Sequence, residues 1–108
     1  TIQNGADAVA LYQDNASNFP NDTALTTTNL IDAVVYDTND SDDSGLLTGL
    51  NESTQWNEDM NSDKDNQSLQ LISDGSYFAM IPTPNAQNTE PSAITYNSVS
   101  TISSLRAG

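Results

Sequence analysis

The stretch Asn29-Leu-Ile-Asp-Ala-Val-Val-Tyr-Asp37 decides the fold class of this chain. It is rich in β-branched and aromatic residues, which favour a strand, and alternate side chains of a strand point to opposite faces of a sheet. The face formed by Ile31, Ala33 and Val35 is wholly apolar, so we expect it to point into a core. We expect Asp32, on the other and more mixed face, to lie near a loop or a sheet edge.

Shorter apolar runs on both sides extend this β pattern. Residues 6–13 form an apolar run with Asn4-Gly5 before it and Asp14-Asn15 after it, which favours a buried strand. Its three alanines also permit a helix. Residues 68–73 and 76–81 flank the turn signal Asp74-Gly75 and predict a hairpin. Proline removes a ladder donor, so Pro82-Thr-Pro84 is expected to end the folded unit.

The connections between these runs are long and polar. Residues 14–28 are expected to form a loop in which Phe19 acts as a plug. Residues 38–66 form a second polar excursion, interrupted by leucines whose spacing predicts one helical turn laid over the sheet: Leu46, Leu47 and Leu50. Trp56 is expected to anchor the return of the chain.

Three aromatic residues allow two interpretations. Tyr12 and Tyr36 lie on the two main predicted strands, and together with Trp56 they could form an aromatic binding platform. Packing in the core or at a strand edge is the commoner role for such side chains. The sequence therefore favours packing and leaves the platform open.

Charge and composition exclude most catalytic chemistry. The 108 residues include fifteen Asp or Glu, the two cations Lys64 and Arg106, and no His or Cys, for a formal net charge of −13. A Ser/His/Asp triad, a thiol nucleophile and a zinc site of nitrogen and sulfur ligands are therefore excluded, and polyanions are repelled. We predict a protein that is not an enzyme and that binds no nucleic acid. No apolar stretch approaches the ~18 residues of a membrane span.

Low aliphatic content combined with this charge lies near the compositional border of intrinsic disorder. The β-branched and aromatic runs favour a folded chain instead, but one with a small core. Without cysteine no disulfide can support that core, so bound ions, glycans or neighbouring chains are the remaining means of stabilisation.

Two acidic runs, residues 37–45 and 57–65, carry the oxygen ligands that calcium prefers, at alternate positions of a loop. Neither run is an EF-hand, since the first lacks Glu at its closing position and the second has Lys64 where that loop needs glycine. Solvated acidic loops are the alternative interpretation. Calcium is the one cofactor that the sequence leaves open, with these candidate ligands: Asp37, Asn39, Asp40, Asp42, Asp59, Asn61, Asp63 and Asp65.

Five Asn-x-Ser/Thr sequons occur, each with a middle residue other than proline. Each could accept an N-glycan in a secretory pathway, which predicts a glycosylated, extracellular protein. Thirteen asparagines in a chain rich in Ser and Thr also produce sequons by chance, and this explanation stays open. The candidate glycosylation sites are Asn15, Asn21, Asn39, Asn51 and Asn66.

The order of these motifs resembles the C-terminal part of the lamin-tail-like domain found in secreted bacterial and animal proteins. The resemblance covers residues 4–88 and predicts a β domain at residues 1–88. A Ser/Thr-rich tail or linker, residues 89–108, is expected to follow, in which residues 93–102 could form an extra strand. It rests on the successive stretches Asn4-Gly-Ala-Asp-Ala-Val-Ala-Leu-Tyr12, Asn29-Leu-Ile-Asp-Ala-Val-Val-Tyr-Asp-Thr-Asn39, Gly45-Leu-Leu, Asn57-Glu-Asp59, Asp65-Asn-Gln-Ser-Leu-Gln70 and Pro82-Thr-Pro-Asn-Ala86.

The resemblance implies an all-β, immunoglobulin-like β-sandwich that serves as a non-catalytic module. The first strands of the family would precede Asn4, so the sandwich is expected to be incomplete here, with strands supplied by another chain or by a missing segment. The family also places a basic residue shortly after Ser-Leu-Gln, where this chain has Leu71 and Ile72.

These observations predict a structural or adhesive module of a secreted, glycosylated protein that assembles with neighbouring chains. Its expected partners are other protein chains, including copies of itself in a homomeric assembly or filament. The alternative is an accessory domain of an extracellular nuclease or related hydrolase, because the family often accompanies such catalytic domains.

Overall fold

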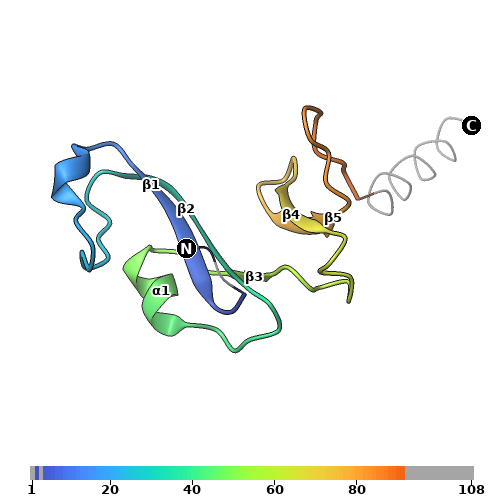
Figure 1. The fold of residues 1–108 in the computed structure, drawn as a ribbon, viewed down its shortest axis with the longest axis horizontal. Coiled ribbons are helices and arrows are strands. Elements are labelled where there is room, and N and C mark those ends of the chain that lie inside the picture. Colours follow the sequence, from blue (N-terminus) through green and yellow to red (C-terminus); the bar gives the residue numbers. More distant parts are fainter. Residues whose placement is uncertain (1, 3, 92–108) are drawn as a thin grey trace, which may run out of the picture.

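Strands dominate the computed structural model, which describes residues 2 and 4–91 (Figure 1). The elements in chain order are β1 (Asp7–Tyr12), the 3-10 helix η1 (Ala16–Asn18), β2 (Leu30–Asp37), α1 (Ser44–Gly49), β3 (Gln55–Asn57), β4 (Ser68–Leu71) and β5 (Tyr77–Met80). This content is consistent with the predicted all-β class. Most of the predicted tail, including the extra strand at residues 93–102, lies outside the described residues.

The strands form two small sheets. The larger has the order β1-β2-β3, in which β1 and β2 are antiparallel and β2 and β3 are parallel. The smaller is the antiparallel hairpin β4-β5, which confirms the hairpin predicted around Asp74-Gly75. Gly75 lies in the turn with a φ of +88°, in the left-handed region that glycine enters without a steric penalty.

One face of the larger sheet is covered by α1 (Figure 1). Ala8 and Ala10 of β1 pair with Val35 and Ala33 of β2, which places these four small side chains on the same face. The helix and its C-cap residue Leu50 add the three predicted leucines, of which Leu50 is buried and Leu46 and Leu47 are half-buried. The predicted helical turn over the sheet is therefore confirmed.

The prediction for the apolar face of β2 is right for Ala33 and Val35 and wrong for Ile31. The pairing with β1 shifts between Leu11 and Tyr12, because Asp32 faces Leu11 while Leu30 faces Tyr12. Ile31 is therefore the extra residue of a β-bulge, and its side chain is 57% exposed. Leu30 packs against the core in its place.

The segment predicted only as a polar excursion also contains β3. This strand is three residues long, and its Gln55 side chain is buried.

In the loop at residues 14–28, the Phe19 ring packs on Tyr12 with the ring centroids 4.8 Å apart, as expected for a plug. Among the described residues, six other than glycine have positive φ, and four of them are asparagines that end or turn polar segments: Asp22, Asn29, Asn39, Asn51, Ser62 and Asn85.

Candidate functional site

The two acidic runs meet because β2 and β3 are parallel. Asp37 pairs with Asn57 at the end of both strands, so the loops that follow begin side by side. Asp37 is buried, and its carboxylate accepts hydrogen bonds from Gln55 Nε2 at 2.9 Å and from the backbone N–H of Asp40 at 3.1 Å. These bonds satisfy a carboxylate that would otherwise be costly to bury.

Asparagine amides link the two loops further along. Asn39 Nδ2 donates to Asp59 Oδ2 at 2.6 Å, and Asn57 Nδ2 donates to Asn39 Oδ1 at 2.9 Å. The Thr38 hydroxyl also donates to the Glu58 carboxylate. The hydrogen bond from Asn39, helped by the backbone N–H and the charge of Lys64, holds the pKa of Asp59 below its usual value.

The structure brings together only part of the predicted calcium site. Asp37, at the end of β2, and Asn39, Asp40 and Asp59 belong to the hydrogen-bonded junction of the two loops, whereas the side chains of the other four make separate contacts or are exposed. Asn61 Nδ2 donates to Ala79 O of β5 at 2.7 Å. Asp63 accepts from Asn66, Asp65 pairs with Lys64 at 3.2 Å, and Asp42 is exposed.

Within residues 2 and 4–91 no group of three or more acidic side chains is close enough to hold a metal ion. Calcium would have to displace the hydrogen bonds of the linked loops, and its binding there stays a prediction.

All five predicted glycosylation sites are exposed on the surface: Asn15, Asn21, Asn39, Asn51 and Asn66. Asn15 caps η1 by accepting from the backbone N–H of Ser17. The nitrogens to which a glycan would attach on Asn39 and Asn66 donate to aspartates. Exposure permits glycosylation without testing it, so this assignment stays a prediction.

The sheet face opposite α1, hereafter the open face, has an apolar and partly exposed centre. This centre consists of Val9 and Leu11 of β1 with Val34 of β2, and Val9 pairs directly with Val34, while the register also places Asp7, Asp32 and the buried Tyr36 on this face. Val9 and Leu11 are 48% and 60% exposed. A shallow apolar groove of about 150 Å³ runs along this face and is closed at one side by Tyr77 of the hairpin.

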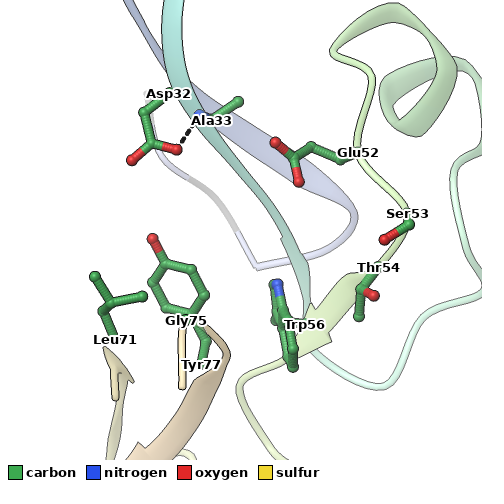
Figure 2. A pocket seen from close by; sticks show the side chains of 9 residues that line it. All are labelled: Asp32, Ala33, Glu52, Ser53, Thr54, Trp56, Leu71, Gly75 and Tyr77. Atoms are coloured by element: carbon green, nitrogen blue, oxygen red, sulfur yellow. Dashed lines mark hydrogen bonds between the residues drawn. The ribbon is translucent and has the colours of Figure 1, made fainter. Parts of the chain in front are cut away.

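Beside the open face lies a larger and more polar cleft of about 370 Å³ (Figure 2). Its lining comes from β2, from β3 and the segment between α1 and β3, and from the hairpin. The side chains of Trp56 and Tyr77 both line it, with ring centroids 5.8 Å apart and planes inclined at 52°. Its lining residues are Asp32, Ala33, Glu52, Ser53, Thr54, Trp56, Leu71, Gly75 and Tyr77.

The cleft carries negative charge. Burial raises the pKa of the Tyr77 hydroxyl, and the nearby carboxylates of Asp32 and Glu52 raise it further. Asp32 Oδ1 accepts a hydrogen bond from the backbone N–H of Ala33 at 2.9 Å. Lys64, the cation of the described residues, pairs with Asp65 and does not line the cleft.

The sequence did not reveal this cleft. Tyr77 was predicted only as a hairpin residue, and Glu52, Ser53 and Thr54 carried no signal, because three separate segments supply the lining. The aromatic platform of Tyr12, Tyr36 and Trp56, which the sequence left open as an alternative to packing, is not formed by the first two of these residues. The Tyr12 hydroxyl donates to Thr26 O at 2.8 Å, and Tyr36 is buried, as the packing interpretation expects.

No known protein family, curated protein or solved structure is significantly similar to this chain. The resemblance to the lamin-tail-like domain is therefore untested and stays a prediction. None of the helices among residues 2 and 4–91 has the length and apolar character needed to cross a membrane.

Proposed function

We propose that this chain is a non-catalytic structural or adhesive module of a secreted, glycosylated protein, and that a partner polypeptide completes its fold. The two sheets would then belong to an immunoglobulin-like β-sandwich whose second layer covers the open face. The observation that carries the proposal is the exposure of Val9 and Leu11 beside Val34 on a sheet whose other face is already covered. A sandwich buries the inner face of each of its two sheets, and here Val9 and Leu11 have no covering layer among the described residues.

The small core supports this proposal. The buried cluster beneath α1 consists of Ala33, Val35 and Leu50, with partly buried alanines and leucines around it. A domain of this size buries a modest fraction of its unfolded surface even with a complete core. Additional apolar burial by a partner would therefore supply stability that this cluster alone provides poorly.

The strand order also leaves edges for pairing. In the sheet order β1-β2-β3, β1 and β3 each pair on one side only among the described residues. Unpaired strand edges present backbone donors and acceptors that an added strand can satisfy. Because β3 is only three residues long, β1 offers the longer edge.

Charge indicates the chemistry of the partner. The chain carries a formal net charge of −13, and Asp7 and Asp32 flank the apolar centre of the open face on β1 and β2. Two copies placed face to face would repel each other, whereas a sheet or strand with an apolar inner face and a basic rim would be attracted. We therefore favour a basic, amphipathic β partner over direct contact between two copies.

The proposal is tested by titrating the full chain with synthetic strand peptides. A peptide of alternating Val and Lys should bind and raise the melting temperature, while a peptide of alternating Val and Glu should not. Leu11→Asn should weaken binding of the Val/Lys peptide and leave the circular dichroism spectrum unchanged, since that side chain is exposed. As the control, Leu25→Asn replaces an exposed leucine away from the open face and should leave binding unchanged.

The chain alone should bind a dye specific for apolar surface and unfold over a broad temperature range. A compact monomer that binds no dye, unfolds in one sharp cooperative transition and ignores both peptides would contradict the proposal.

A further inference from the structure

We propose that the cleft between Asp32, Glu52, Trp56 and Tyr77 binds a neutral carbohydrate, as a single sugar ring or the terminal ring of a glycan. The inference goes beyond the proposed function and does not depend on a partner covering the open face. The volume of about 370 Å³ falls in the lower part of the ~300–1,000 Å³ range of small-molecule pockets.

The polar groups of the cleft call for a ligand that both donates and accepts hydrogen bonds. In Figure 2 the Tyr77 hydroxyl and the Trp56 indole nitrogen lie at the ends of their rings that face Asp32 and Glu52. Carboxylates only accept, and an indole N–H only donates, whereas a hydroxyl does both. Each sugar hydroxyl can therefore donate to a carboxylate and accept from the indole or the phenol.

Several of these groups are available to a ligand. The side chains of Trp56 and Tyr77 interact with each other through their rings, and the Tyr77 hydroxyl also lies in the field of the two carboxylates. One Asp32 oxygen bonds its neighbouring backbone, which leaves the other oxygen for a ligand. Hydrogen bonds from neutral hydroxyls to carboxylates are stronger than those between two neutral groups.

A cationic ligand suits the charge of the cleft but not the orientation of its rings. Cations bind over the negative face of an aromatic ring, whereas the ring edge is positive. The two rings pack on each other at 52° and present their polar edges to the cleft. An anionic sugar is disfavoured by Asp32 and Glu52. Neutral hydroxyl groups satisfy both the carboxylates and the ring edges.

Trp56 is the single tryptophan of the chain, so its fluorescence reports directly on the cleft. We would titrate the full chain with glucose, galactose, mannose, N-acetylglucosamine, glucuronate and arginine. At least one neutral sugar is expected to give a saturable change with a millimolar Kd, with weaker binding of glucuronate. Amide shifts in the NMR spectrum of the wild-type chain should concentrate at residues 52–56 and 75–77.

Two conservative variants assign the contacts. Tyr77→Phe removes only the hydroxyl and Glu52→Gln only the charge, and each should weaken sugar binding roughly fivefold to tenfold. Tyr12→Phe is the matched control, because the Tyr12 hydroxyl bonds Thr26 O and does not line the cleft.

The proposal is overturned if no neutral sugar gives saturation, if arginine alone does so, or if Tyr77→Phe and Glu52→Gln bind as the wild type does. The amide shifts of the wild-type chain on addition of sugar locate the binding site even where a variant fails to fold, and shifts away from the cleft would also contradict the proposal. Sugar binding without peptide binding, or the reverse, separates this inference from the proposed function.

Discussion

At the scale of single residues, hydrogen bonds between amides and carboxylates organise the acidic loops. Gln55 binds the buried Asp37, and Asn39 binds Asp59 across the junction of two loops. An Asn or Gln amide donates to a carboxylate without adding charge, so the chain can hold acidic segments together with few cations. The many asparagines therefore have a structural use besides any glycosylation.

The pKa of Asp59 tests this role. In Asn39→Gly the amide donor at 2.6 Å is lost while the left-handed backbone is tolerated, so the lowered pKa of Asp59 should rise toward 3.8. Because the folded pKa lies below the unfolded one, the carboxylate stabilises the fold above pH 3.8, and this contribution disappears as the pH falls through the folded value.

The measurement is a carboxyl-carbon NMR titration of the wild type and the variant. Asp14, whose pKa is lowered mainly by the backbone N–H of Asn15, serves as the internal control and should titrate identically in both proteins. If the pKa of Asp59 is the same in the variant and the wild type, Asn39 is not the group that lowers it.

Part of the candidate site was visible in the sequence. Asp32 was conspicuous as a carboxylate inside an apolar strand, and Trp56 as a large ring in a polar segment. Glu52 and Tyr77 could not be assigned, because they reach the cleft through the parallel pairing of β2 with β3 and the placement of the hairpin. Neither arrangement leaves a local pattern in the sequence.

At the scale of elements, α1 is short and depends on its cap. Asp43 Oδ1 accepts from the backbone N–H groups of Gly45 and Leu46 at 2.9 and 3.0 Å. A six-residue helix has few internal hydrogen bonds, so the cap and the packing of its leucines on the sheet hold it in place.

We expect Asp43→Ala to destabilise α1 by about 1 kcal/mol, the usual effect of losing such a cap. The effect should appear as faster amide hydrogen exchange at Leu50, which donates to Leu46 O across the helix. Asp42→Ala removes the same charge from the exposed neighbouring position and should leave this exchange rate unchanged. Equal acceleration in both variants would assign the effect to charge and not to capping.

The elements with a clear local sequence pattern were predicted, whereas the elements that depend on pairing with residues far away in the sequence were not. β1, β2, α1 and the hairpin each follow from apolar spacing or a turn signal. Gln55–Asn57 has no such spacing and becomes a strand only through its parallel neighbour. The bulge at Ile31 likewise depends on the pairing with β1, and it reverses the expected placement of Ile31 and Leu30.

At the scale of the whole molecule, repulsion between acidic side chains counteracts the stability that the small core provides. Fifteen acidic residues against two cations create mutual repulsion in the folded chain, while few side chains are fully buried. Val35 and Leu50 are the large side chains with almost no exposure among the described residues. Stability should therefore respond strongly to the ionic environment.

Sodium chloride is expected to raise the melting temperature of the chain by a few degrees, because ~0.1 M salt screens charges beyond ~10 Å. Millimolar calcium at matched ionic strength should raise it further if the loops bind the ion as the sequence predicts. Magnesium at the same concentration is the control for divalent screening. Equal effects of both ions would reject a specific calcium site, and an unchanged temperature in sodium chloride would show that repulsion is not limiting.

Asparagines with positive φ can be both glycosylation sites and residues that the backbone turn requires, so the two roles need to be tested separately. Asn39 and Asn51 are both sequon residues and both left-handed, with φ of 63° and 57°. Glycine tolerates that backbone geometry but cannot carry a glycan. In a secreting host, Asn51→Gly would thus separate the two uses: the backbone turn should survive the exchange, and any mass contributed by an oligosaccharide at that site should vanish. Asn39→Gly would in addition remove the hydrogen bond to Asp59.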